Sequence, residues 1–326
     1  MTVRERRMVP KAEFGSYYDR PIIKPPVWKV PDVPAYLYLG GMAGVSASLG
    51  ALGDLTGRPS LRRVGRIAAA GGAVSSVGFL IHDLGRPERF LNMMRVLKPT
   101  SPLSVGSWIL APFGTLAGAT AAAELTGLSP RLARVSGLAA GVLGPAMTTY
   151  TAVLLADTAV PGWHEAYREL PFVFAGSALA AGGGACLLAG RDAVSVRQDP
   201  RIPPDRPGPA RRVAVAGAAL ELAAMAVLER RIGHAATAYT TGRAGTVLAA
   251  SRAATVLGAA AAVASGVVRG RRGRILGAVA GLVLNASSAA TRYGVFEAGM
   301  VTARDPSYVV VPQREGMRAR KVEAAE

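Results

Sequence analysis

Long apolar stretches alternate with short, arginine-rich segments along most of the 326-residue chain. A helix that crosses a hydrocarbon core of about 30 Å needs roughly 20 mostly apolar residues. Five of the eight stretches reach that length, and the second, sixth and eighth need flanking residues to complete a span. The predicted spans are Val33–Gly53, Ile67–His82, Ser101–Ala123, Val135–Ala156, Leu170–Gly190, Val213–Leu228, Ala244–Val268 and Ile275–Thr291. The pattern predicts an all-α polytopic membrane protein with eight transmembrane helices in two four-helix halves.

Alanine and glycine fill these spans, so the mean hydropathy is only +0.28. Helices in lipid associate through close backbone approach, which small residues permit. Small residues recur at four-residue spacing at Gly40, Gly44 and Ser48 in the first span, and at Gly277 and Gly281 in the eighth. Two interpretations remain open: specific helix packing, or the alanine-heavy composition of a GC-rich genome.

The formal net charge of +17 has a membrane explanation. The arginines lie between apolar spans and form no basic face with interleaved aromatic residues, so no nucleic-acid partner is expected. The loops after the odd-numbered spans hold 4, 2, 6 and 4 lysines or arginines, and the loops after the even-numbered spans hold 4, 1 and 3. Because cytoplasmic loops are rich in basic residues, we predict a multi-pass protein of the inner (cytoplasmic) membrane with both termini on the outer side.

Proline-rich segments divide the chain into four predicted parts. Residues 1–32 form an N-terminal strap in which prolines alternate with large apolar residues. Such a stiff, extended segment suits contact with a partner subunit, although it could also cover its own bundle or the lipid interface. The first four-helix half covers residues 33–156, the second covers 157–291, and a C-terminal tail covers 292–326. No signal peptide precedes the first span.

The segment from 83 to 100 has the pattern of a short helix at the membrane interface. Phe90, Met93, Met94 and Leu97 recur at helical spacing.

Ionisable and polar residues at membrane depth are costly, so each is a functional candidate. His82 and Asp83 end the second span and Arg86 follows; together they could hold and deprotonate a quinol head group, or simply cap the helix end. Tyr150 in the fourth span could donate a hydrogen bond to a quinone carbonyl, although most buried tyrosines bond to a neighbour within the protein.

Glu221 and Arg252 lie at similar depths in the sixth and seventh spans, which predicts a salt bridge between them. The pair could relay protons, act as a structural staple, or line the path of a secondary transporter, which is the alternative function.

The metal-binding residue types are scarce. The three histidines, His82, His164 and His234, cannot place two imidazoles at one depth inside neighbouring spans, so no haem is expected. The single Cys186 cannot hold an iron–sulfur cluster, and no metal-site spacing is present. Electrons would therefore have to enter or leave through another chain.

The chain resembles the NrfD/PsrC family, the membrane subunits of polysulfide reductase-like molybdoenzyme complexes. The most specific segment is the run from His82 through Asp83-Leu-Gly-Arg-Pro to Ser101-Pro-Leu-Ser-Val-Gly-Ser-Trp108. Similar segments are Phe14–Pro21 with Pro34–Gly41, Tyr150–Trp163, Arg292–Gly299 and Ala303–Tyr308.

The resemblance implies a quinone site in the first half, near a surface that docks an iron–sulfur subunit. Asp83 would be the proton-exchanging residue, and Tyr150, Arg86, His82, Tyr38 and Tyr36 would complete the site. Glu221, Arg252 and Arg292 are the candidates for a proton relay, of which Glu221 and Arg292 resemble charged family positions.

The partners implied by the resemblance are a four-iron ferredoxin-like subunit and a molybdopterin catalytic subunit, of the formate dehydrogenase-like or polysulfide/thiosulfate reductase-like type. Menaquinone would be the exchangeable carrier. A pure anchor without a working quinone site is a third hypothesis.

Overall fold

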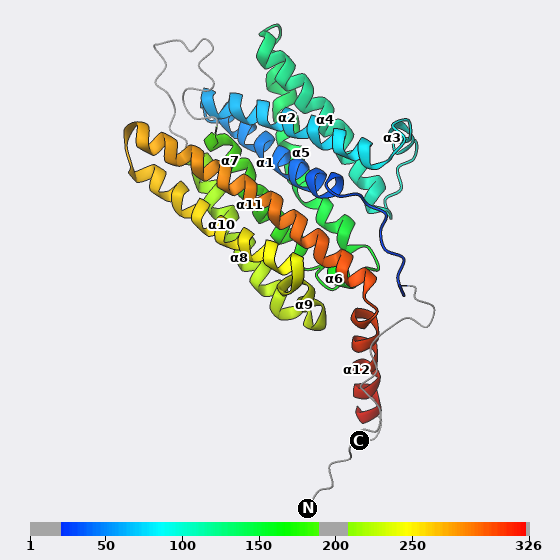
Figure 1. The fold of residues 1–326 in the computed structure, drawn as a ribbon. Helices are drawn as coiled ribbons and strands as arrows, with labels where there is room; N and C mark the ends of the chain where they lie inside the picture. Colours follow the sequence, from blue (N-terminus) through cyan, green and yellow to red (C-terminus); the bar gives the residue numbers. More distant parts are fainter. Residues whose placement is uncertain (1–20, 189–207, 324–326) are drawn as a thin grey trace, which may run out of the picture.

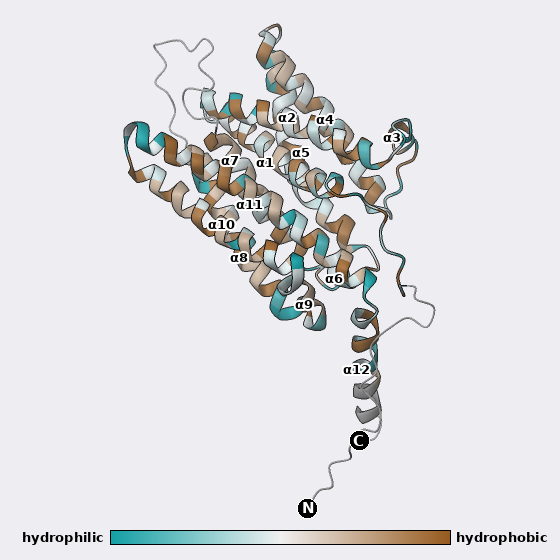
Figure 2. Ribbon diagram, in the orientation of Figure 1, coloured by the Kyte–Doolittle hydropathy of each residue, from teal (hydrophilic) through white to brown (hydrophobic). Residues whose placement is uncertain are grey.

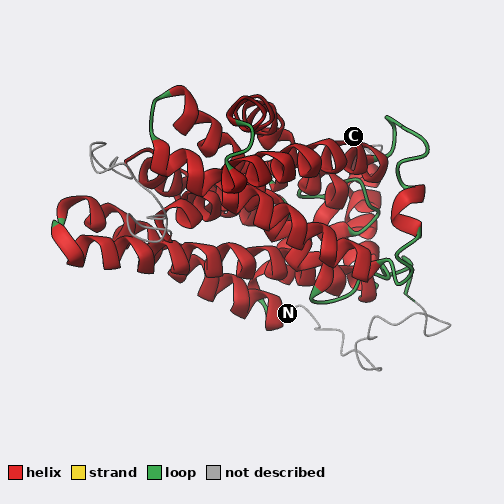
Figure 3. Ribbon diagram, turned by 90° about the horizontal axis from the view of Figure 1, so that it is seen from above, coloured by secondary structure: helices red, strands yellow, loops and turns green. Residues whose placement is uncertain are grey.

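A computed structural model of the chain describes residues 21–188 and 208–323, and every regular element in these ranges is a helix (Figures 1 and 3). Eight helices are long, and α12 follows them. The long helices are α1 (Asp32–Leu55), α2 (Pro59–Asp83), α4 (Pro102–Thr126), α5 (Pro130–Ala156), α7 (Leu170–Leu188), α8 (Gly208–Arg231), α10 (Gly242–Val267) and α11 (Gly270–Arg304). The shorter elements are α3 (Arg89–Asn92), α6 (Pro161–His164), η1 (Gly233–Ala236), α9 (Thr237–Thr240) and α12 (Ser307–Glu323).

Local sequence signals explain several helix ends. Pro59, Pro102 and Pro130 occupy the first turns of α2, α4 and α5, where proline costs no helical hydrogen bond. The Ser129 hydroxyl accepts a hydrogen bond from the Leu132 N–H and caps α5. Gly127 ends α4 with a φ of 70°, a left-handed conformation that favours glycine.

Seven of the long helices are apolar and long enough to cross a membrane: α1, α2, α4, α5, α7, α10 and α11. The sixth predicted span forms a helix, α8, but this helix carries Arg211, Arg212, Glu221, Glu229, Arg230 and Arg231. These charges leave α8 without the long apolar window that each of the other seven helices has. The structure thus confirms an all-helical membrane fold, and an eighth span remains a prediction.

Most of the observed helices extend beyond the predicted spans at one or both ends. The largest difference is in α11, where the predicted span Ile275–Thr291 lies within a 35-residue helix that ends at Arg304. Residues after Thr291 continue the helix because Phe296, Ala298 and Met300 remain buried in the bundle. Beyond it, α12 projects from the end of the bundle (Figure 1).

The predicted interfacial helix between residues 83 and 100 is reduced to the four residues of α3. Phe90, Met93 and Met94 are half-buried, while Leu97 is exposed.

Close contacts between small residues hold the bundle together. A side chain at Gly44 would meet the Gly144 carbonyl oxygen at 2.5 Å, and the Ser48 hydroxyl donates to the Gly141 carbonyl oxygen at 2.9 Å. Gly281 of α11 packs in the same way against the backbone of Gly184 in α7. Specific packing is therefore confirmed for the first span and for Gly281, whereas Gly277 has only ordinary contact distances.

Large apolar side chains point outward along the helices, as expected for a protein surrounded by lipid. Val74, Val142 and Leu257 expose 69%, 80% and 67% of their surface. Hydrophobic residues cover much of the bundle, and hydrophilic residues gather toward its ends (Figure 2).

Candidate functional site

A buried carboxylate and an exposed imidazole meet where α1 begins and α2 ends. Asp32, in the first turn of α1, is 3% exposed. Its Oδ2 lies 2.7 Å from Nδ1 of His82 in the last turn of α2. The His82 side chain is 75% exposed. The imidazole therefore connects the outside of the bundle with a carboxylate that is otherwise enclosed.

Asp83 fastens the segment that precedes α1. Its Oδ1 accepts a hydrogen bond of 2.8 Å from the Lys29 backbone N–H, and the Lys29 Nζ donates to the His82 carbonyl oxygen at 3.3 Å. The strap, as far as the structure describes it (21–31), is thus tied to the end of α2. The other Asp83 oxygen has no hydrogen bond among the residues that the structure describes.

Two tyrosines lie deeper in the bundle. Tyr36 follows Asp32 by one helical turn, a rise of about 6 Å. Its hydroxyl is hydrogen-bonded to the hydroxyl of Tyr150 from α5, and both residues are buried. The Tyr150 ring packs on Gly106 of α4, where a Cβ would lie 2.5 Å from the ring. We call Asp83, His82, Asp32, Tyr36 and Tyr150 the polar line, because they follow one another from the end of the bundle inward.

An aromatic stack closes the same end of the bundle. Trp28 of the strap stacks on Trp163 of α6 at 5.5 Å between ring centroids, and Phe296 lies 5.8 Å from Trp163. The Trp163 Nε1–H donates to the Val295 carbonyl oxygen at 2.8 Å. The strap therefore covers its own bundle at Trp28, while Val27 is 83% exposed.

Tyr239 of α9 holds the α6 segment. Its hydroxyl donates to the Gly162 carbonyl oxygen at 2.7 Å. Burial raises the pKa of this hydroxyl above its usual range, so it remains a neutral donor.

Two of the predicted quinone-binding residues lie apart from the polar line. Tyr38 is two positions after Tyr36 and faces another side of α1, where its hydroxyl donates to Asn285 Oδ1 of α11 at 2.8 Å. Arg86 is exposed in the turn after α2, and within the described chain it forms no ion pair.

The predicted salt bridge between Glu221 and Arg252 is wrong. Arg252 Nη1 lies 2.8 Å from Glu229 Oε2 instead. Eight residues separate Glu221 from Glu229, so the two carboxylates point about 80° apart around α8. Glu229 faces α10, whereas Glu221 faces α11. Depth along a helix does not fix the direction in which a side chain points around the helix axis. Equal depth therefore did not predict the contact partner of Arg252.

Glu221 contacts α11 beside Arg292 without a salt bridge to it within 4.0 Å, and both residues are almost completely buried. Glu221 Oε1 accepts a hydrogen bond from the Thr291 hydroxyl at 2.5 Å. The Arg292 Nη2 donates to the Phe174 carbonyl oxygen at 2.7 Å, and its guanidinium lies 3.7 Å from the centre of the Phe174 ring. Arg292 Nε and Nη1 and Glu221 Oε2 are buried without hydrogen-bond partners among the described residues.

Comparison with known protein families shows what kind of bundle this is. A family model described as "Polysulphide reductase, NrfD" matches residues 22–228, a range that contains the whole polar line. The chain belongs to the NrfD family. Membership confirms the resemblance and indicates a multi-pass membrane subunit of an oxidoreductase complex. No curated protein matches the chain. The matched range ends within α8, so α10 and α11, which supply Arg252, Asn285 and Arg292, lie outside it.

Sequence reasoning missed three residues that shape this end of the NrfD bundle. Asp32 precedes the first apolar stretch and has the pattern of an ordinary acidic residue at a helix start. Trp163 lies in a loop between two predicted spans, and its stacking on Trp28 depends on tertiary structure. Asn285 was part of a span without a predicted role. Of these three residues, only Asp32 could have been identified from the sequence, because any carboxylate adjoining a span is a functional candidate.

Proposed function

We propose that this NrfD protein is the quinone-reactive membrane anchor of a molybdopterin oxidoreductase, and that it passes electrons between the menaquinone pool and an iron–sulfur subunit. The observation that supports this most strongly is the polar line. It places side chains able to exchange protons at the bundle end, one helical turn from paired phenols inside the bundle.

The oxidation of a quinol releases two electrons and two protons, and reduction of the quinone reverses this. Proton exchange needs acid–base groups near the head group. Asp83 and His82 stand at the mouth of the bundle, and Asp32 accepts a proton through His82 Nδ1. The carboxylates and the imidazole therefore provide a proton path between the head group and the exterior.

The tyrosines orient the head group in this proposal. A phenol hydroxyl donates a hydrogen bond to a carbonyl oxygen of a quinone, or accepts one from a quinol hydroxyl. In the Tyr36–Tyr150 pair one hydroxyl donates and the other accepts, so the accepting hydroxyl keeps a proton that it can donate to a quinone oxygen while the pair stays intact. Arg86 would complete the site from outside.

Electrons must continue into a partner, since one buried cysteine in this chain cannot bind a cluster. The proposed partner is a four-iron ferredoxin-like subunit that docks where the strap, α6 and α12 meet. Ile22, Val27 and Val30 of the strap are more than half exposed, an apolar surface suited to an interface. Through that subunit, the chain would serve a formate dehydrogenase-like or polysulfide/thiosulfate reductase-like catalytic subunit.

The same proposal includes an eighth transmembrane span and an orientation of the chain in the membrane. The 24 residues of α8 measure about 36 Å, enough to cross the hydrocarbon core. With α8 included, α1, α2, α4 and α5 form one half, and α7, α8, α10 and α11 the other. The distribution of loop arginines places the strap and α12 on the outer side of the membrane.

The transport alternative needs Glu221 and Arg252 to line one path, but Glu221 bonds to Thr291 of α11 while Arg252 pairs with Glu229, so its support is weaker.

Replacement of Asp83 by Asn tests the proposed function. Asn retains an oxygen that accepts the Lys29 N–H, so the strap stays in place while the proton acceptor is lost. We expect quinone-linked turnover of the purified complex to fall by about 10²–10⁴-fold. Electron transfer from the catalytic subunit to a soluble dye should remain unchanged.

The matched control is Asp157→Asn, which removes an exposed carboxylate after α5, also at the end of the bundle where α2 ends. Its quinone-linked turnover should equal that of the native complex. Full quinone-linked turnover in Asp83→Asn would remove Asp83 from the reaction, and equal losses in both variants would indicate a general charge effect.

A further inference from the structure

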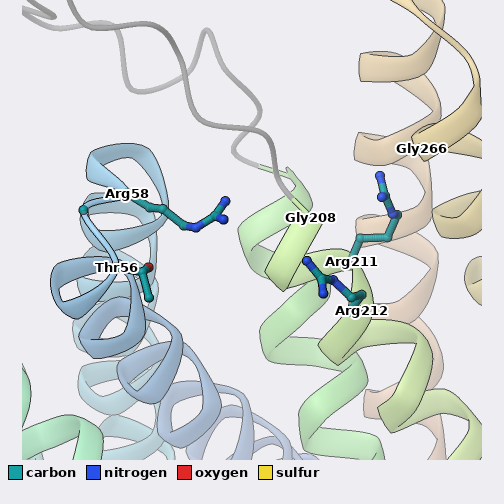
Figure 4. A pocket seen from close by; sticks show the side chains of 7 residues that line it. Thr56, Arg58, Gly208, Arg211, Arg212 and Gly266 are labelled. Carbon is teal, nitrogen blue, oxygen red and sulfur yellow. The ribbon is translucent and has the colours of Figure 1, made fainter.

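A cavity of about 540 Å³ opens at the end of the bundle opposite the polar line. Its walls come from the turn between α1 and α2, the start of α8 and the end of α10 (Figure 4). The 24-residue α1 separates this cavity from Asp32 by about 36 Å. The cavity is therefore independent of the proposed quinone site, and its volume lies in the range of roughly 300–1,000 Å³ typical of ligand pockets.

Among the residues that the structure describes, arginines supply every charged side chain of the lining. They are Arg58, before the first turn of α2, and Arg211 and Arg212, in the first turn of α8. Figure 4 shows the Arg58 side chain extending into the space between α2 and α8 and the Arg211 side chain turned toward Gly266. The Arg212 guanidinium lies near Gly208 of its own helix. Three cationic side chains from two helix starts thus converge on one cavity.

Glycine in α10 gives Arg211 its position. The Arg211 guanidinium lies so close to Gly266 that any side chain at that position would displace it. Gly266 therefore lets the guanidinium pack directly on the helix backbone at the rim of the cavity.

Acidic side chains do not neutralise the two arginines of α8. In the described parts of the chain, neither Arg211 nor Arg212 forms an ion pair with a carboxylate. Asp54, the acid nearest in sequence to Arg58, is engaged by Arg66 at 3.6 Å and by Arg134 at 3.4 Å. As far as the described residues show, the Arg211 and Arg212 guanidinium groups are therefore available to an external anion.

The chemistry of the lining selects the phosphate group. Guanidinium groups present a planar fork of donors that matches phosphate oxygens, and the positive end of the α8 dipole adds to the attraction. Exposed apolar side chains near the cavity favour a phosphate that carries acyl chains. Leu55, next to Thr56, is 67% exposed, and Val263 and Val267, near Gly266, are 53% and 79% exposed. Basic pockets between transmembrane helices recognise anionic lipid head groups in this way.

We propose that this cavity binds the phosphate of an anionic phospholipid. Arg211 and Arg212 are the direct ligands, Arg58 faces them across the cavity, and the acyl chains lie along the exposed residues of α1 and α10. The arginine-rich loops place the cavity on the cytoplasmic side, where the leaflet carries the anionic lipids that attract basic segments.

Lipid titration of the purified complex in a neutral detergent tests this site. The probes are phosphatidylglycerol, phosphatidylcholine as the neutral lipid, and inorganic phosphate at matched ionic strength. Thermal unfolding reports stabilisation, and mass spectrometry of extracted lipid reports binding. The test variant carries Arg211→Gln and Arg212→Gln, and the control carries Arg271→Gln and Arg272→Gln, two exposed arginines at the start of α11 at the same end of the bundle.

Phosphatidylglycerol should stabilise the native complex and the control equally. Its affinity for the test variant should be at least about tenfold lower, since each charge-assisted hydrogen bond contributes about a factor of ten. Equal stabilisation by phosphatidylcholine, an unchanged affinity in the test variant, or an equal loss in the control would overturn the proposal. Stabilisation by inorganic phosphate that matches that by the lipid would show a small-anion site and overturn the assignment to lipid.

Discussion

The two groups of helices, α1–α5 and α7–α11, use buried polar residues in different ways. In the first, the polar line begins at an exposed imidazole and continues inward through neutral or singly charged partners. In the second, Glu221 and Arg292 are enclosed on all sides, at 3% and 0% exposure. The first arrangement reaches the exterior through the exposed His82 side chain, and the second encloses two opposite charges within the bundle.

The difference suggests separate duties for the two groups. Side chains that exchange protons must be accessible, and removing one of them changes activity more than stability. A buried ion pair is costly to break, because the remaining charge loses its compensation. Arg292 also lies next to Gly41 of α1, so this staple joins α11 to the helix that begins the polar line.

The largest stability effect is expected for Glu221→Gln. Arg292 would remain buried without its counter-charge, which should lower the free energy of unfolding by about 3–5 kcal/mol. The double variant Glu221→Gln with Arg292→Gln should recover most of that loss in thermal unfolding of the complex. Quinone-linked turnover per folded complex should not change. If turnover falls while stability holds, Glu221 belongs to a proton relay and the division of duties is wrong.

Tyr150→Phe should lower both the stability of the protein and its quinone-linked turnover. Removal of its hydroxyl leaves the Tyr36 hydroxyl buried and unpaired, which should cost about 1–3 kcal/mol of unfolding free energy. Adding Tyr36→Phe should restore stability but not quinone-linked turnover. The comparison requires denaturation curves and quinol kinetics on both variants. Recovery of turnover in the double variant would mean that the phenols serve only to pack the helices.

Gly44→Ala tests the contact on which the polar line depends. The added Cβ would meet the Gly144 carbonyl oxygen at 2.5 Å, so α1 and α5 must separate at a cost of about 1–3 kcal/mol. Gly71→Ala in α2 is the matched control, since a Cβ there meets nothing within 4 Å. The control should keep or slightly raise the unfolding temperature, because alanine favours helix. Equal unfolding temperatures for the two variants would refute tight packing at Gly44.

The smallest effect is expected for Arg252→Gln. Its partner is Glu229, and the two side chains are 37% and 17% exposed. Loss of this pair should change the unfolding free energy by no more than about 1 kcal/mol and leave quinone-linked turnover intact. A loss of turnover as large as that of Asp83→Asn would return Arg252 to the proton path.

The eight apolar stretches predicted the helices because span length and backbone satisfaction in lipid are local requirements. Tyr150, His82 and Asp83 were identifiable from polarity at membrane depth, and Tyr36 from the family resemblance. Their partners were not, because the contacts of Asp32 with His82 and of Tyr38 with Asn285 depend on how helices rotate about their axes. The same uncertainty assigned Arg252 to Glu221 rather than to Glu229.

Photolabelling of the complex with an azido-menaquinone tests the central claim most directly. After illumination and proteolysis, mass spectrometry locates the modified peptides, with excess unlabelled menaquinone as competitor. The polar line predicts competitor-sensitive labels on the peptides of α1, α2 and α5 that contain Tyr36, Asp83 and Tyr150. Specific labels confined to α8, α10 and α11 would contradict a quinone site in the first half of the bundle.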